Sequence, residues 1–307
     1  MLGLSQKHQT LLFLIITIPL YKLKAAVLIA CHNRKEKTRN CLQNLFEQDL
    51  PKGSTLDVFL CDDGSTDSTS EMIRSEFPQV HLVFGDGNLF WNGGMDLAWK
   101  NAIEFDDFDF YFWLNDDTFL LPNAIKNIYA DYIKVGKPNI ITAACKTPNT
   151  EEFSYGGWDG FGPIKPKREL QRVTLISGNF VIIPKEIVKK IGRLSSSYTH
   201  YLGDYDYGLR AIEAGFICYT SSDYLAECST NILPYWGNPT YPLRKRWKML
   251  HDVKGQAFYE YIHFKFRHYG VLIGIKTMVD TYSKVLSPNA YTSFRNMVRK
   301  KVLKRAD

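Results

Sequence analysis

The chain has 307 residues, of which 45% are hydrophobic and 23% are charged, and its formal net charge is +6. This length accommodates one large α/β domain or two small ones, and the composition is that of an ordinary folded protein rather than a disordered one. The six cysteines are scattered without a CxxC pair, which favours reduced thiols in a reducing compartment over a zinc site or a disulfide framework.

The amino-terminal segment is apolar over residues 11–20, a run that is too short to span a bilayer. No small-residue cleavage site follows before the next apolar run, which begins at Ala25. We therefore expect residues 1–24 to be a dispensable or surface-lying extension that touches a membrane interface at most, rather than a signal for export.

Strand-like and helix-like segments alternate along most of the chain. We expect strands at residues 25–30, 56–60, 80–84, 108–114, 140–144, 173–183 and 216–219. We expect helices at residues 35–48, 68–76, 95–103, 122–132, 185–191 and 207–215. This alternation predicts an α/β fold with a doubly wound, mostly parallel sheet and flanking helices. Beyond residue 234 the pattern becomes helical, aromatic and basic.

The most informative stretch is the aromatic strand at 108–114, which ends abruptly at Asn115, Asp116 and Asp117. Carboxylates at the carboxyl end of a strand lie where open α/β sheets bind their ligands. A hard cation such as Mg²⁺ or Mn²⁺, held by one or two such groups, fills its other positions with phosphate oxygens and water. A metal–diphosphate site is one interpretation, and an acidic turn that caps the next helix is the other.

Three further segments have both a functional and a structural interpretation. In DDGSTD at 62–67, Asp63 can accept hydrogen bonds from a base edge, or the segment is an ordinary helix cap. In the glycine-rich loop at 88–94, Trp91 offers a stacking surface, or the loop is a structural turn. Asp204 can serve as a general base, or it joins Asp206 in capping a helix with a salt bridge to Arg210.

The order of the motifs is more specific than any one of them. ACHNR at 30–34, DDGSTD at 62–67, GNLFWNGGMDLAWKNA at 87–102, NDD at 115–117, SGNFVIIPKEIVKKIG at 177–192 and GDYDYGLR at 203–210 together resemble the family 2 glycosyltransferases, inverting enzymes with the GT-A fold. The resemblance covers residues 25–228. It implies a catalytic domain at 25–233, with a nucleotide-sugar half at about 25–120 and an acceptor half at about 121–233, followed by a helical basic region at 234–307.

The resemblance also implies a role for each matching residue. The donor nucleotide would be bound by Cys31, Asn33, Arg34, Asp63, Asn88, Trp91, Gly93, Gly94 and Asp116. Asp117, with Asn115 beside it, would hold a divalent cation, Mn²⁺ or Mg²⁺, that bridges the donor diphosphate. Asp204 would deprotonate the acceptor hydroxyl. Gly178, Asn179 and Asp206 would lie on the acceptor side.

The chain departs from the family pattern at several positions. Asn115 stands where a first Asp is common, and Gly203 replaces a Glu that usually precedes the base. Cys228 lies in the region where many relatives carry a His, so no third metal ligand is assigned. Arg246-Trp247 is present without the Gln of processive synthases, which favours a single-sugar transferase similar to rhamnosyltransferases.

The expected activity is transfer of one sugar from a UDP- or dTDP-sugar to a hydroxyl of a glycan or lipid-linked oligosaccharide, in cell-surface polysaccharide synthesis. The aromatic, basic region at 247–305 suits an anionic membrane surface at the cytoplasmic face, and a simple helical cap is the alternative. No nucleic-acid partner is expected.

Two other functions stay open. A nucleotidyltransferase should show glycines directly after the first strand, which ACHNRKEK lacks. A non-catalytic nucleotide-sugar-binding module is disfavoured by the presence of Asp63, Asp117 and Asp204 together.

Overall fold

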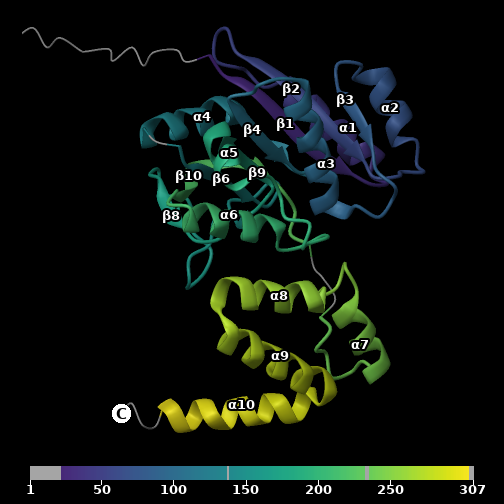
Figure 1. Ribbon diagram of the computed structural model, residues 1–307, viewed down its shortest axis with the longest axis vertical. Coiled ribbons are helices and arrows are strands. Elements are labelled where there is room, and N and C mark those ends of the chain that lie inside the picture. The colour runs from purple at the N-terminus through teal and green to yellow at the C-terminus, as the bar shows by residue number, and fades with distance from the viewer. Residues whose placement is uncertain (1–21, 137, 232–234, 304–307) are drawn as a thin grey trace, which may run out of the picture.

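The computed structural model of the protein describes residues 22–136, 138–231 and 235–303, and the apolar run at 11–20 lies outside these residues. An α/β domain comes first in the chain, and four helices follow it at the carboxyl-terminal end of the described residues (Figure 1). The expected α/β fold class with a helical carboxyl-terminal region is therefore confirmed.

The strands and helices have the following bounds. The strands are β1 (Lys24–Cys31), β2 (Thr55–Asp62), β3 (His81–Phe84), β4 (Phe110–Leu114), β5 (Phe119–Leu120), β6 (Ile140–Lys146), β7 (Phe153–Tyr155), β8 (Gln171–Val173), β9 (Phe180–Pro184) and β10 (Cys218–Glu227). The helices are α1 (Lys35–Phe46), α2 (Thr69–Glu76), α3 (Phe90–Phe105), α4 (Ala124–Val135), α5 (Lys185–Ile191), α6 (Gly203–Glu213), α7 (Leu243–His251), α8 (Phe258–Tyr269), α9 (Val271–Leu286) and α10 (Pro288–Leu303).

The sheet is parallel in its amino-terminal half and mixed beyond it. Within the described residues its order is β3-β2-β1-β4-β9-β6-β10-β5, with β7 and β8 paired at the side. β1 pairs with β2 and β4 in parallel, and β2 pairs with β3 in the same way. β9 runs antiparallel between β4 and β6. The alternation of strands and helices therefore gives parallel pairing up to β4, and the insertion of β9 reverses the direction.

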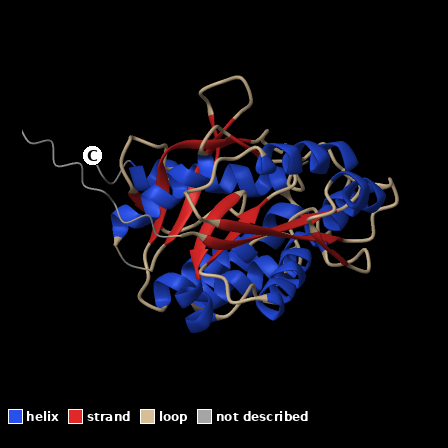
Figure 2. Cartoon of the chain, turned by 90° about the horizontal axis from the view of Figure 1, so that it is seen from above, coloured by secondary structure: helices blue, strands red, loops and turns tan. Residues whose placement is uncertain are grey.

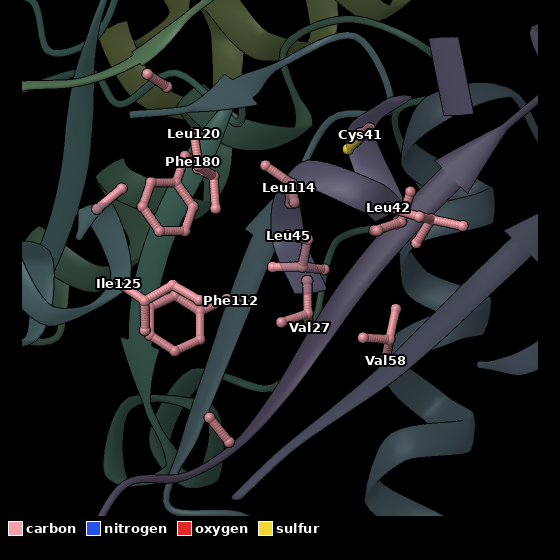
Figure 3. Packing of buried hydrophobic residues seen from close by; sticks show 14 of the residues in the cluster. Val27, Cys41, Leu42, Leu45, Val58, Phe112, Leu114, Leu120, Ile125 and Phe180 are labelled. Atoms are coloured by element: carbon pink, nitrogen blue, oxygen red, sulfur yellow. The ribbon is translucent and has the colours of Figure 1, made fainter. Parts of the chain in front are cut away.

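The core has two layers because side chains alternate between the two faces of each strand. On β1, Val27 packs with Phe112 and Leu42 on the face covered by α1, whereas Leu28 belongs to the cluster on the opposite face with Trp99 and Trp113. Figure 3 shows the first cluster, and Figure 2 shows helices on both sides of the sheet. β1 is buried on both faces, as its uninterrupted apolar sequence predicts.

Several expected boundaries are wrong. The strand expected at 173–183 is divided between β8, which ends at Val173, and β9, which begins at Phe180, and the helix expected at 207–215 is α6, which begins at Gly203. Two further differences have clear physical reasons. The helix expected at 95–103 is α3 and already begins at Phe90, so Gly93 and Gly94 lie in its first turns rather than in a loop. A side chain on Gly94 would come within 2.9 Å of the Cβ of Ala30, so this glycine lets α3 pack closely on β1. The strand expected at 216–219 continues to Glu227, with register shifts that interrupt its alternation of side chains.

The carboxyl-terminal helices have a small core of their own, formed by Leu250, Phe258, Ile262 and Val285. The buried guanidinium of Arg246 ties α7 to α9, because it donates to the carbonyl oxygen of Val285 at 2.9 Å. No helix in the described part of the chain is long and apolar enough to cross a membrane.

Candidate functional site

Two adjoining cavities open at the carboxyl ends of β1, β2 and β4. The Asp63 cavity has a volume of about 480 Å³, and the Asp204 cavity has a volume of about 440 Å³. Both are lined by Arg34, Trp91, Asp116, His200, Tyr201 and Asn231. This shared lining makes them two parts of one cleft, at the edge of the sheet where ligands of open α/β folds bind.

The acidic pair after β4 lies between the two parts of this cleft. One terminal nitrogen of Arg34 donates to Asp116 and to Asp117, each at 2.9 Å. The side chains of these two aspartates are only 5% and 13% exposed. Burial raises the pKa of Asp116 to about 6, Arg34 opposes this shift, and Asp117 adds to it. The pair therefore favours a positive partner.

This arrangement fits a hard cation held by few protein ligands. No three His, Cys, Asp or Glu side chains converge on one point within the described ranges, but a cation that shares its coordination with phosphate oxygens and water needs only one or two carboxylates. Asp117 and Asp116 are the carboxylates available for it. The side-chain oxygen of Asn115 already accepts the indole N–H of Trp91 at 2.7 Å. The Sγ atom of Cys228 lies 4.0 Å from Asp117.

Asp63 lines its cavity, and backbone N–H groups hold its carboxylate in place. Its two carboxylate oxygens accept the N–H groups of Gly87 and Phe90, each at 2.8 Å. An added side chain on Gly85 would come within 2.4 Å of Asp63, so the loop after β3 depends on a glycine there. A base edge would thus use the lone pairs of Asp63 that the backbone leaves free.

Four residues expected to bind the nucleotide lie outside the cavity lining. Asn33 accepts the N–H of Thr66 at 2.7 Å and holds the 62–67 turn in place. Asn88 is exposed on the surface. Gly93 faces Leu89, and Gly94 faces Ala30, inside the packing of α3. Asn33, Gly93 and Gly94 contact the scaffold, so these three residues shape the cleft rather than line it. Cys31, Arg34, Asp63, Trp91 and Asp116 do line the Asp63 cavity.

Asp204 lies in the first turn of α6 and faces the Asp204 cavity. Its carboxylate accepts the N–H of Gly178 at 2.9 Å and the N–H of Tyr205 at 2.8 Å. Burial nevertheless raises the pKa of Asp204 to about 6. A carboxylate in this state is ionised at neutral pH and basic enough to take a proton from a hydroxyl.

The segment at 177–179 lies directly beside Asp204. An added side chain on Gly178 would come within 2.5 Å of the Trp91 ring, so this glycine lets the indole lie against the segment. Asn179 donates to the hydroxyl of Thr118 at 3.1 Å and to Cys228 at 3.3 Å. Gly178 and Asn179 line the same cavity, and their role on the acceptor side stays a prediction.

Asp206, also expected on the acceptor side, lies instead in a buried ion-pair cluster away from the cavity lining. Its carboxylate accepts from Arg210 at 2.7 Å and lies 2.8 Å from Nε2 of His268 in α8. This is the salt-bridge alternative seen in the sequence, extended by a histidine from the carboxyl-terminal region. Asp206 points away because neighbouring positions on a helix face different directions.

The sequence interpretation did not include several residues that line the cleft, namely Tyr155, His200, Tyr201, Asn231 and Lys254. Tyr155 ends β7, and the other four come from loops that converge only in the fold. Burial lowers the pKa of His200 to about 4, and Lys254 and Arg34 add to this shift. Its buried Nδ1 atom has no hydrogen-bond partner among the described residues, so a neutral imidazole faces both cavities.

Comparisons with known proteins agree with this architecture. The model of Glycosyl transferase family 2 matches residues 26–192, which is more than half of the 307 residues. The 4,4'-diaponeurosporenoate glycosyltransferase of Staphylococcus aureus is 27% identical over 123 residues, which cover 38% of this chain and 30% of that protein.

Solved structures show the same fold at low sequence identity. S. aureus TarS matches 68% of this chain and 37% of its own, with a TM-score of 0.52 and 16% identity. TarS 1-349 in complex with UDP-GlcNAc matches 86% of this chain and 82% of its own, with a TM-score of 0.54 and 15% identity. GalNAc-T7 with UDP, GalNAc and Mn²⁺ matches 75% of this chain and 48% of its own, with a TM-score of 0.56 and 14% identity. The chain thus spans 30% of the curated relative and 37% of S. aureus TarS.

Proposed function

Because this chain belongs to glycosyl transferase family 2, we propose that it transfers a single sugar, with inversion, from a UDP- or dTDP-sugar to a hydroxyl of a glycan or lipid-linked oligosaccharide. The observation that carries this proposal is the placement of Asp117 and Asp204 on one cavity of about 440 Å³, which adjoins the cavity lined by Asp63. The complexes of the solved relatives with UDP, UDP-GlcNAc and Mn²⁺ support a nucleotide-sugar donor and a divalent cation.

The residues of the cleft have separate roles in the reaction. Asp63 holds the base of the donor, and Asp204 takes the proton from the acceptor hydroxyl. The hydroxyl oxygen then forms a bond to the anomeric carbon, while the bond from that carbon to the phosphate oxygen breaks and the nucleoside diphosphate leaves with the electron pair. Attack from the side opposite the nucleotide inverts the configuration of the anomeric carbon.

The leaving diphosphate gains negative charge in the transition state. A divalent cation, Mn²⁺ or Mg²⁺, held by Asp117 and Asp116 would supply positive charge at this point. This charge would stabilise the transition state more than the ground state. Arg34, which bridges the same two carboxylates, lies at the same place and can add to this stabilisation.

The carboxyl-terminal region supports the proposed acceptor and place of reaction. Leu272 of α9 is 83% exposed and Phe294 of α10 is 60% exposed, and the chain ends in a basic segment whose side chains from Arg299 onward lie outside the described ones. Apolar and basic groups together suit an anionic membrane surface. We infer a peripheral enzyme of cell-surface polysaccharide synthesis at the cytoplasmic face. Leu272→Glu should then weaken binding of the protein to anionic vesicles. Unchanged binding would contradict the role of α9.

The test of the transferase activity is a donor-hydrolysis screen. The full chain is incubated with a panel of UDP- and dTDP-sugars and Mn²⁺ or Mg²⁺, beside Asp117→Ala and Asp204→Asn. Cation-dependent release of one nucleotide, lost in Asp117→Ala, is the expected result and identifies the donor. If the panel gives no release, a direct titration with UDP and dTDP decides, because a missing acceptor also suppresses turnover. Absence of nucleotide binding in that titration would overturn the proposal.

A further inference from the structure

The carboxyl-terminal region reaches into the Asp63 cavity through a single loop. Residues 252–257 connect α7 to α8, and Lys254 of this loop lines the cavity together with Arg34 and Asp63 from the amino-terminal half. Figure 1 shows α7 and α8 beside the α/β domain, although they come more than a hundred residues later in the sequence than the acidic pair. The lining of this cavity therefore comes from both ends of the described chain.

The loop that carries Lys254 is held in one conformation. The carbonyl oxygen of Asp252 accepts the N–H of Gly255 at 2.9 Å and the N–H of Ala257 at 3.0 Å, and its side chain accepts the N–H of Lys254 at 2.9 Å. A side chain on Gly255 would come within 1.9 Å of a backbone oxygen, so the turn requires glycine. Tyr201 also donates its hydroxyl to the carbonyl oxygen of Lys254 at 3.2 Å.

A second contact fixes the α/β domain against α8 at the same place. Glu260 accepts the backbone N–H of Thr199 at 2.9 Å and its hydroxyl at 2.6 Å. Thr199 directly precedes His200 and Tyr201, which line both cavities. The position of Lys254 relative to the cleft is thus set by hydrogen bonds on both sides of it.

The ammonium group of Lys254 is the cation of this cavity that lacks a carboxylate partner. Arg34 is neutralised by Asp116 and Asp117, whereas the ammonium of Lys254 forms no ion pair within the described part of the chain and lies 5.7 Å from the centre of the Phe90 ring. Asp63 lines the same cavity, but both of its oxygens are engaged by backbone N–H groups. A positive side chain in a cleft that no carboxylate contacts is an anion-binding feature.

We propose that Lys254 binds the diphosphate of the donor nucleotide and that the carboxyl-terminal region is thereby part of the donor site. The inference rests on the proposed function and deepens it. A phosphate of a lipid-linked acceptor has the same chemistry, but Lys254 lines the cavity of Asp63 and not the cavity of Asp204. The donor is therefore the source of the phosphate.

The test compares nucleotides that differ only in phosphate, using the full chain. Binding of UDP, dTDP and uridine is measured by calorimetry for the wild type, Lys254→Ala and Lys254→Arg. Lys248→Ala is the matched control, because Lys248 is an exposed lysine of α7 outside both cavities. We expect Lys254→Ala to weaken diphosphate binding about 10- to 100-fold, as loss of a charge-assisted hydrogen bond does. Uridine binding should not change, and Lys254→Arg should retain most of the affinity.

The outcomes separate this inference from the function on which it rests. If the wild type binds UDP or dTDP and Lys254→Ala binds them equally well, the inference is wrong and the proposed function stands. An equal loss of uridine and UDP binding in Lys254→Ala would also overturn it, since the residue would then act on the shape of the cavity. If the wild type binds neither diphosphate, the proposed function and the inference fail together.

Discussion

The guanidinium of Arg34 lies 2.9 Å from the carboxylate of Asp117, the residue proposed to hold the cation. The same nitrogen lies 2.9 Å from Asp116, so one positive side chain is shared by both carboxylates. A cation that binds this pair must share it with Arg34 or displace Arg34. The charge of Arg34 and the affinity of the site for a cation are therefore coupled.

Replacement of Arg34 by glutamine is expected to strengthen Mn²⁺ binding by the nucleotide-free protein about tenfold, because a positive charge a few ångströms from the site is removed. Calorimetric titration with Mn²⁺ measures this change. Lys248→Gln is the control, since Lys248 is an exposed lysine of α7 outside both cavities. Unchanged or weaker Mn²⁺ binding in Arg34→Gln would show that the cation does not use this pair.

The pH dependence of the reaction should follow Asp204. Burial raises the pKa of Asp204 to about 6, so the carboxylate is protonated and unable to accept a proton below that pH. The rate of donor hydrolysis should therefore rise between pH 5 and pH 7 and level off above pH 7. The rate of Asp204→Asn should be at least about 100-fold lower than that of the wild type at every pH.

Nucleotide binding at the same pH values separates chemistry from donor affinity. We expect the affinity of Asp204→Asn for UDP or dTDP to match that of the wild type, because Asp204 faces the other cavity. A hydrolysis rate that is flat between pH 5 and 7, or an Asp204→Asn variant that remains active, would exclude Asp204 as the base.

The fold class and the family could be predicted because their signals are local. β4 is a short aromatic run that stops at charged residues, and DDGSTD follows β2 in the same way. The order of the motifs along the chain is visible without a structure. The family match over residues 26–192 confirms this part. The individual roles of Asp63, Asp117 and Asp204 remain predictions, although the fold gathers these three residues at one cleft.

The remaining features depend on contacts between distant segments. Asp206 and Asp204 look equivalent in the sequence. Only the contact with His268 in the structure shows that Asp206 is the one used for packing. Lys254 lies in a loop without any motif and enters the cavity only because α8 docks against the segment at Thr199. Side chains that reach a site from a separate region leave no pattern in a single sequence.

The contact between His268 and Asp206 should hold the carboxyl-terminal region on the α/β domain. Their side chains are 1% and 4% exposed and lie 2.8 Å apart. Removal of one partner from a buried hydrogen bond typically costs about 1–3 kcal/mol, so His268→Ala should lower the free energy of unfolding by roughly this amount. Arg267→Ala is the matched control, because its pair with Glu213 is about half exposed and should contribute less than about 1 kcal/mol.

Denaturant unfolding of the two variants measures this difference, and limited proteolysis shows whether the carboxyl-terminal helices are released first in His268→Ala. Equal stabilities of His268→Ala and Arg267→Ala would mean that the remaining pair of Asp206 with Arg210 is sufficient.

Gly203, which replaces the glutamate usual in the family, is required by its contact with Asn92. A side chain at this position would come within 1.9 Å of the Asn92 side-chain oxygen. Asn92 is buried and donates to the carbonyl oxygens of Ser195 at 2.9 Å and Tyr198 at 2.7 Å, so it fixes the segment that leads to His200. We expect Gly203→Ala to destabilise the protein by about 1–3 kcal/mol, as overpacking of a buried contact does.

Gly160→Ala is the control for this substitution, because no atom lies within 4 Å of the added carbon, and it should change stability by less than about 0.5 kcal/mol. A double-mutant cycle then tests the cause. Asn92→Ala removes the clashing oxygen but also the two hydrogen bonds, so it destabilises the protein alone. If the clash is the cause, Asn92→Ala and Gly203→Ala together must cost less than the sum of the two single changes. Additive costs would mean that Gly203 is needed for a reason other than Asn92.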